Sequence, residues 1–162
     1  MRPVYRPVII ITLLILVLFA FSAGGSEALP GDRVDFDMTV QRLYERAQRM
    51  PVGPAGDDTI FILDGHVAAI SILPGDGPFR AEIELVTGSW QGLRRVTLHR
   101  VIVVADEGFE SRISARPLPQ PDPGMVVSGI EILVAGRITE IRQDSGGRRV
   151  PVVQADRIRT RR

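Results

Sequence analysis

The sequence contains no cysteine, no lysine and no asparagine. Without cysteine the chain has no thiol nucleophile, no disulfide, no thiolate zinc site and no cysteine that could carry a lipid. Without lysine it has no amine for a Schiff base, and without asparagine it has no N-x-S/T glycosylation acceptor. Only two histidines are present, His66 and His99. The usual inventory of catalytic side chains is therefore small.

The composition is that of one folded domain. The chain has 162 residues, of which 44% are hydrophobic and 24% are charged. These values are typical of globular proteins, and a chain of this length can bury a core without disulfides or metals. We expect a single domain rather than a disordered chain.

Residues 1–28 have the layout of a secretory signal peptide or of an uncleaved signal anchor. Two arginines precede a hydrophobic run from Val8 to Ala23 that contains only two polar residues. Small residues follow, so cleavage after Ala28 is compatible with the pattern. The run is at the short limit for crossing a bilayer core of about 30 Å. We expect a hydrophobic N-terminal helix and an extracytoplasmic domain, residues 29–162, that is either periplasmic or anchored with the domain outside.

Segments of alternating apolar and polar residues recur along residues 29–162 and predict β-strands. One segment, 41–50, has apolar residues at helical spacing and predicts a short helix. Asp64-Gly65, between two apolar runs, predicts a type I′ hairpin turn. The predicted strands cover residues 34–40, 60–63, 66–73, 79–87, 96–105, 109–115, 130–141 and 148–155.

Several positions predict irregularities in this β-rich domain. A change in the alternation near His99 and Arg100 predicts a β-bulge. Gly136 inside a strand predicts a sharp bend, and Pro151 predicts that the last strand lies at an edge or a bulge. Residues 116–124 hold four prolines and predict a stiff loop across one end of the domain.

These elements predict an all-β fold with at most one short helix. The architecture is a small barrel or a sandwich. A glycine-interrupted strand and a short helix among five or more strands would suit a barrel of the oligonucleotide/oligosaccharide-binding (OB) type. No motif assigns the chain to a family.

The titratable residues are better explained by structure than by catalysis. His66 lies near Asp57, Asp58 and Asp64, but one histidine with loop carboxylates is a poor metal site, and turn chemistry explains the aspartates. His99 has the position of a partly exposed strand residue, and no G-x-S-x-G motif is present. We predict no catalytic residue, no metal and no cofactor.

Trp90 is the single tryptophan, within the sequence GSWQG. This sequence predicts a loop between two strands. Two interpretations stay open for the ring. It could fold back over the end of the barrel, or it could be an exposed stacking surface for a sugar or a partner.

Arginines are concentrated near the C-terminus. Residues 29–128 carry a net charge of −4 and residues 129–162 a net charge of +4. Nucleic acid is predicted to be an unlikely partner, because aromatics are scarce and the exported chain would be neutral. We predict that Arg148 and Arg149 guard an edge strand. We predict a solvated tail, or one that touches an anionic membrane surface, from Arg157, Arg159, Arg161 and Arg162.

The sequence thus predicts an exported domain of a bacterial envelope with a non-enzymatic binding or scaffolding role. Its predicted partner is an envelope protein or an anionic membrane surface, with an oligosaccharide as a further candidate ligand. One alternative is an exported hydrolase or sugar-acting enzyme that uses pairs of Asp and Glu. Another is an OB-type module that binds oligonucleotides or oligosaccharides.

Overall fold

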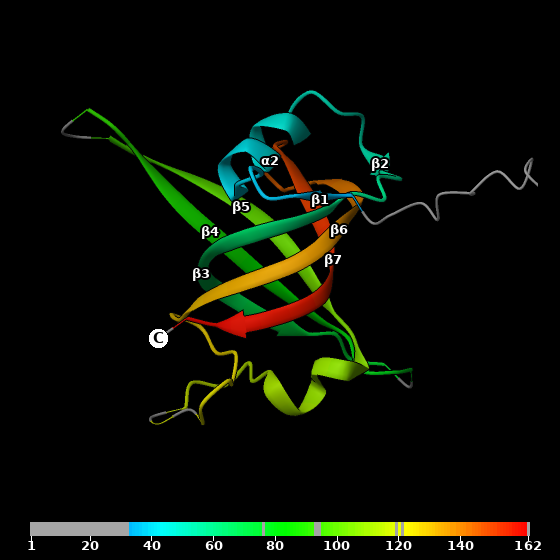
Figure 1. The fold of residues 1–162 in the computed structure, drawn as a ribbon, viewed down its shortest axis with the longest axis vertical. Helices are drawn as coiled ribbons and strands as arrows, with labels where there is room; N and C mark the ends of the chain where they lie inside the picture. Colours follow the sequence, from blue (N-terminus) through cyan, green and yellow to red (C-terminus); the bar gives the residue numbers. More distant parts are fainter. Residues whose placement is uncertain (1–32, 76, 93–94, 119, 121, 162) are drawn as a thin grey trace, which may run out of the picture. The chain divides into compact units, whose positions relative to one another are not determined.

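The computed structural model describes residues 33–161, except residues 76, 93–94, 119 and 121. Seven strands, one α-helix and one 3-10 helix are formed by these residues (Figure 1). Their bounds, in chain order, are β1 Val34–Asp35, α2 Val40–Ala47, β2 Gly53–Pro54, β3 Ile60–Ile72, β4 Ala81–Gln91, β5 Arg95–Ala105, η1 Glu107–Arg112, β6 Glu131–Gln143 and β7 Arg149–Thr160.

The five long strands close into a barrel. The sheet order is β1-β3-β4-β5-β7-β6-β2, and an additional pairing of β3 with β6 closes the ring. All neighbours in the ring are antiparallel except β5 and β7, which are parallel. This five-stranded Greek-key barrel is OB-like. The prediction of an all-β fold with one short helix is confirmed, and the architecture is a barrel rather than a sandwich.

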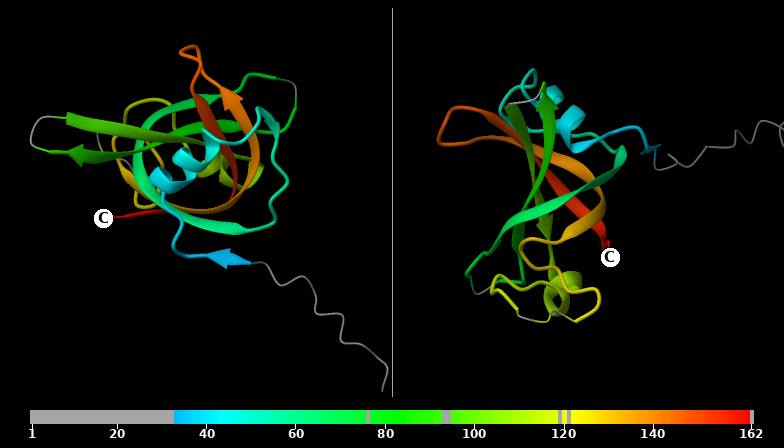
Figure 2. Two further views of the ribbon diagram at one scale, coloured as in Figure 1. Left: turned by 90° about the horizontal axis from the view of Figure 1, so that it is seen from above. Right: turned by 90° about the vertical axis from the view of Figure 1, so that its left-hand side faces the viewer.

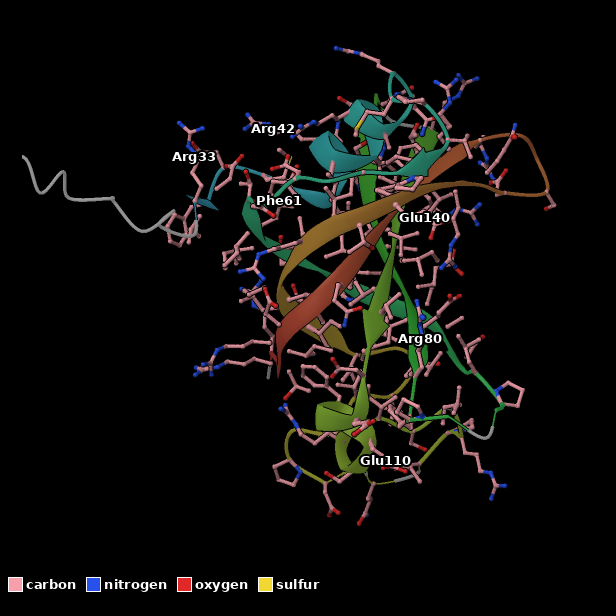
Figure 3. The ribbon with its side chains drawn as sticks, turned by 90° about the vertical axis from the view of Figure 1, so that its right-hand side faces the viewer. Arg33, Arg42, Phe61, Arg80, Glu110 and Glu140 are labelled. Carbon is pink, nitrogen blue, oxygen red and sulfur yellow. The ribbon has the colours of Figure 1, made fainter. Side chains whose placement is uncertain are left out.

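The barrel core is continuous with the elements that close its two ends. Helix α2 buries Val40, Leu43 and Ala47 against the strands. At the other end, Phe109 of η1 joins the same cluster, and Figure 2 shows η1 and its following loop below the strands. Phe61, labelled in Figure 3, is fully buried. The strand residues with no exposed surface are Phe61, Leu63, Ala81, Ile83, Leu85, Val101, Val103, Ala105, Ile132, Val134, Ile141 and Val153.

Strand β3 runs through Asp64-Gly65, so the predicted hairpin at this pair is wrong. Up to His66 the strand pairs with β6, and from His66 onward it pairs with β4. A Cβ atom at Gly65 would lie 2.8 Å from the carbonyl oxygen of Val86. The glycine is therefore used for a close approach of two strands within the barrel rather than for a turn.

The segment predicted as a strand over residues 34–40 is mostly the approach to α2. Only Val34 and Asp35 are in β1. The Asp35 carboxylate then accepts hydrogen bonds from the backbone N–H groups of Asp37 and Met38. Thr39 caps the helix by accepting from the N–H of Arg42. Local side-chain hydrogen bonds outweighed the alternating pattern. The predicted helix over residues 41–50 is confirmed as α2.

Other predicted irregularities are partly wrong. β4 continues through Gly88 to Gln91, where a break was expected, and β4 and β5 pair without a bulge at His99. Residues 107–112 form a 3-10 helix rather than part of a strand. An irregularity is present at Gly136, since the pairing of β6 with β7 shifts there and a Cβ atom would clash with the carbonyl oxygen of Gln154.

The predicted signal peptide or anchor, residues 1–28, lies outside the described residues. Within the described part of the chain, no helix is long and apolar enough to cross a membrane.

Candidate binding surfaces

The β4–β5 hairpin extends beyond the barrel and carries an exposed apolar surface. Trp90, Val96 and Leu98 are 74%, 45% and 64% exposed. The register pairs Trp90 with Val96 and Gly88 with Leu98, so these positions share one side of the hairpin. We call this side of residues 88, 90, 96 and 98 the hairpin face.

Gly88 shapes the hairpin face. A Cβ atom there would lie 3.2 Å from Cγ1 of Val96 and 3.7 Å from Cδ2 of Leu98. The absence of a side chain at Gly88 therefore makes room for the side chains of Val96 and Leu98. It also leaves a shallow depression on β4 beside Trp90. The interpretation of Trp90 as a ring folded over the barrel end is wrong, because the ring is exposed on a strand.

The opposite side of the projecting hairpin is polar and rests on α2. His99 is only 5% exposed, and its Nε2 atom lies 2.9 Å from the Ser89 hydroxyl oxygen. The Tyr44 ring of α2 packs edge-on against the imidazole, with ring centroids 5.6 Å apart. The prediction of a partly exposed His99 is therefore wrong. These contacts fix the hairpin to the barrel by its polar side and leave the hairpin face outward.

The barrel part of the same hairpin has a different outer surface. Arg142 Nη1 lies 2.7 Å from Glu82 Oε1, and Arg142 Nε lies 3.1 Å from Glu140 Oε2. Arg100 pairs with Glu84 at 3.5 Å and also with Asp144. We call this group the base network, and its members are Glu82, Glu84, Arg100, Glu140, Arg142, Asp144 and Arg148.

The base network shifts the titration of two of its members. The hydrogen bond that Arg142 donates to Glu82 raises the pKa of the Arg142 guanidinium above its ordinary value, against a smaller opposing effect of burial. The backbone N–H of Arg148 donates to Asp144, and this hydrogen bond is the main cause of a lowered pKa for the Asp144 carboxyl. The charges on this surface are thus largely neutralised within the protein.

Arg148 and Arg149 do not guard an edge strand, so that prediction is wrong. β7 lies between β5 and β6, and Pro151 directly precedes the residues that pair with β5. Arg148 contacts Asp144 across the β6–β7 turn at 3.1 Å. Arg149 donates to the carbonyl oxygen of Gln48, just after α2. Both arginines hold parts of the domain together.

The arginines predicted to form a tail belong mostly to β7, so the tail is corrected to a strand. Arg157 and Arg159 are exposed on β7, and within the described residues neither makes an ion pair. Arg161 lies just beyond the strand and contacts Glu131 at 3.1 Å and Asp64 at 3.4 Å. Arg162 lies outside the described residues. The structure does not bring these arginines together with Trp90 into one site.

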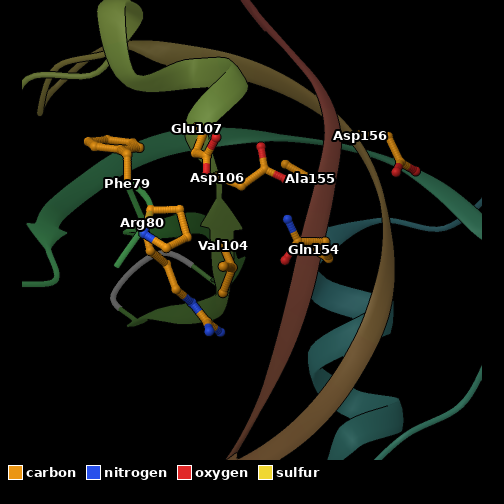
Figure 4. Close-up of a pocket in the computed structure, with 9 residues that line it drawn as sticks. Phe79, Arg80, Val104, Asp106, Glu107, Gln154, Ala155 and Asp156 are labelled. Carbon is orange, nitrogen blue, oxygen red and sulfur yellow. The ribbon is translucent and has the colours of Figure 1, made fainter. Parts of the chain in front are cut away.

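A cavity of about 480 Å³ lies beside the short pairing of β5 with β7 (Figure 4). Asp106, Glu107 and Asp156 line it together with Arg80. The hydrolase hypothesis requires a pair of Asp and Glu side chains in one cleft. The three carboxylates of this cavity are exposed, and Trp90 is not among its lining residues.

The other titratable residues considered as site candidates make local contacts or face solvent. Asp57 accepts from the N–H of Thr59 and pairs with Arg46 at 3.2 Å. A hydrogen bond with the Thr59 side chain is the main cause of a lowered pKa for the Asp57 carboxyl, and the Thr59 N–H contributes less. His66 is exposed on β3. In the part of the chain that the structure describes, no group of three or more His, Asp or Glu side chains could hold a metal ion.

Val96 and Leu98 were not among the residues predicted to form a binding site. The available signal was the change of phase near His99, which marks the point where the apolar side of β5 passes from the barrel interior to the outside.

No protein-family model matches the chain, and no curated protein matches its sequence. One solved structure that resembles it is a crystal structure of a small single-stranded DNA-binding protein from Streptomyces coelicolor. The TM-score is 0.41 and the identity is 15%, over 66% of this chain and 96% of that chain. The prediction that nucleic acid is an unlikely partner is wrong in light of this similarity.

Proposed function

We propose that this protein is a non-enzymatic binding domain that engages its partner through the hairpin face. The observation that carries the proposal is the exposure of Trp90, Leu98 and Val96 on one side of a projecting hairpin. Contiguous exposed apolar surface on a soluble domain marks an interaction site. Tryptophan is also the residue type most enriched among those that dominate binding energy.

The distribution of polar residues on the hairpin supports this proposal. In the barrel part, apolar side chains point inward and Glu82 and Glu84 point outward. In the projecting part the arrangement is reversed, with Ser89 and His99 on the side of α2 and the apolar residues outside. The register between β4 and β5 does not change. The projecting part thus has the polarity expected if a partner covers its outer side.

The N-terminal segment supports an extracytoplasmic location as part of the same proposal. The run from Val8 to Ala23 would direct the chain to export, and residues 29–162 would then act in the envelope. The test is protease accessibility of residues 33–161 in intact spheroplasts. Protection of the domain until the membrane is lysed would contradict this location.

The hairpin face is tested by photo-crosslinking from its centre. A photoreactive amino acid replaces Leu98 in the full chain, expressed in its own cells, and the matched control carries it at Ile72, which is 44% exposed outside the projecting part of the hairpin. We expect a discrete adduct from position 98 that disappears with Trp90→Ala, and no such adduct from position 72. Equal labelling from both positions, or an adduct indifferent to Trp90→Ala, would contradict the proposal.

Single-stranded nucleic acid is a second candidate, because an exposed aromatic ring such as that of Trp90 is a stacking surface for bases. Arg157 and Arg159 add unneutralised charge on β7. If this candidate is correct, oligonucleotides quench Trp90 fluorescence with an affinity that falls steeply with salt. Saturable quenching by neutral oligosaccharides alone would exclude it.

A further inference from the structure

The projecting part of β4 has an open edge. β3 pairs with β4 only as far as Val86, opposite His66, whereas β5 pairs with β4 up to Gln91. Among the strands that the structure describes, none lies beside residues 87–91 on the side away from β5. Figure 2 shows this part of the hairpin reaching beyond α2 and the barrel.

This edge lacks the usual protection against pairing with another chain. Natural edge strands are guarded by charged residues, proline or bulges. Residues 86–91, Val-Thr-Gly-Ser-Trp-Gln, contain no charge and no proline, and their pairing with β5 is regular. The end of β5, by contrast, carries the exposed Arg95. The open edge of β4 is therefore suited to strand addition.

The edge is also complementary to itself. If two copies of β4 pair antiparallel with Ser89 opposite Ser89, then Gly88 of each copy lies opposite Trp90 of the other. Both positions belong to the hairpin face, and the side chains beside Gly88 are Val96 and Leu98. The indole of each copy would fill the space over the glycine of the other, a pairing that stabilises sheets.

We propose that a second copy of this chain is the partner of the hairpin face, in a two-fold dimer formed by antiparallel pairing of β4 with β4. The inference rests on the proposed function, because it names the partner of the same surface. A two-fold axis through Ser89 gives a closed, isologous interface. Since the paired residues carry no charge, the symmetry brings no like charges together on this edge.

The expected interface is small. Each buried aromatic side chain contributes roughly 150–250 Å², and each copy adds Val96 and Leu98. The total falls near the lower end of specific interfaces, about 1,200 Å². The dimer is therefore expected to dissociate on dilution.

The test uses the absence of cysteine from the chain. Ser89→Cys places two thiols across the axis, where opposite Cα atoms in a sheet are about 4.5–5.5 Å apart, within disulfide range. Full-length protein in mild detergent is oxidised and examined without reductant. We expect a disulfide-linked dimer from Ser89→Cys, and about 30-fold weaker dimerisation when Trp90→Ala is added. Arg95→Cys, on the β5 edge, is the control and should give little dimer.

A second pair of variants checks the register without touching the Ser89–His99 contact. Thr87 is predicted to face Gln91 of the other copy. Thr87→Cys and Gln91→Cys should each give no dimer alone, because like thiols lie about 13 Å apart along the strand, but a mixture of the two should crosslink. Absence of a dimer from both Ser89→Cys and the mixture overturns the inference, as does equal crosslinking from Arg95→Cys.

The two proposals can fail separately. A Trp90-dependent photo-adduct at position 98 with a different molecule, combined with no disulfide at position 89, would leave the hairpin face as a binding site and exclude the dimer. No Trp90-dependent adduct and no disulfide would exclude both.

Discussion

The outer side of the β4–β5 hairpin changes character along its length. In the barrel part, Glu82 and Glu84 are held by Arg142 and Arg100. In the projecting part, the equivalent positions hold Gly88 and Trp90, opposite Leu98 and Val96. The two parts share one uninterrupted register, so the difference comes from side chains and not from the backbone.

This difference shows which part of the surface has its groups satisfied within the chain. The charged groups of the barrel part are neutralised by ion pairs with other side chains of the chain, so this part gains little from a partner. The apolar groups of the projecting part are in contact with water, which disfavours them by roughly 25 cal/mol for each Å² of apolar surface. The projecting part is therefore the part whose energetics would change most when a partner binds.

The largest expected effect is a difference in stability loss between alanine variants of two leucines of the hairpin. Leu85 is fully buried in the barrel, whereas Leu98 is 64% exposed. Leu85→Ala should lower the free energy of unfolding by about 2–5 kcal/mol, because it leaves a cavity. Leu98→Ala should change it by less than about 0.5 kcal/mol. Urea unfolding of the full chain at high dilution measures both. A large loss for Leu98→Ala would show that the hairpin face packs within its own monomer.

The fold was predictable to the level of its class because alternation and turn residues recur throughout the chain. The residues that fixed the class are those of β4, β6 and α2, whose patterns match their burial closely. Asp64-Gly65 was misleading because the preference of this pair for a turn is local, whereas the need for a glycine beside Val86 arises from barrel closure.

The candidate site was predictable only in part. Trp90 could be singled out because it is the single tryptophan, but nothing local distinguishes an exposed ring from a covered one. Leu98 and Val96 alternate with polar residues just as the core residues of β5 do. Which side of the strand is buried depends on where the barrel ends along β5, and the local sequence does not show this. The predicted role of the arginines was wrong because the sequence does not show their contacts. Arg148 pairs with Asp144 across a turn, and Arg149 donates to the distant Gln48 carbonyl oxygen.

The next effect concerns how the projecting part is held on α2. Ser89→Ala should lower the free energy of unfolding by about 1–3 kcal/mol, because it removes the hydroxyl that pairs with the buried His99 imidazole. Thr97→Ala is the matched control, because Thr97 is on the same side of the hairpin and its side chain makes no hydrogen bond to the described residues. Thermal unfolding measures both variants. Equal losses would mean that packing, rather than the Ser89 hydroxyl, holds the hairpin.

A smaller effect is expected in the base network. Arg142→Met removes contacts with Glu82 and Glu140, all of which are partly exposed. Ion pairs of this kind contribute about 0–1 kcal/mol and are weakened by salt. We expect a small loss of stability at low salt that disappears at high salt. Arg116→Met, at an exposed position outside any ion pair of the described residues, is the control. A loss that persists at high salt would indicate that the arginine stem acts by packing.

The smallest expected effect is the pH dependence of the stability that the base network contributes. The pKa of Asp144 is lowered in the folded protein, chiefly because it accepts from the N–H of Arg148. A lowered folded-state pKa means that the ionised carboxyl stabilises the fold at pH values above its ordinary pKa of about 3.9, and that this contribution is lost as the pH falls through the folded value. Asp144→Asn should therefore be less stable than the wild type at neutral pH.

The difference between the wild type and Asp144→Asn should shrink as the pH falls from about 3.9, the ordinary pKa, through the lowered folded-state pKa, where the carboxyl becomes protonated in the folded protein. Thermal unfolding of both proteins across this range tests the sign. The hairpin face carries no titratable group at positions 88, 90, 96 and 98, so Leu98→Ala should show the same small difference from wild type at every pH. A pH-independent deficit in Asp144→Asn would mean that its hydrogen bonds, and not its charge, hold the β6–β7 turn against the barrel part of the hairpin.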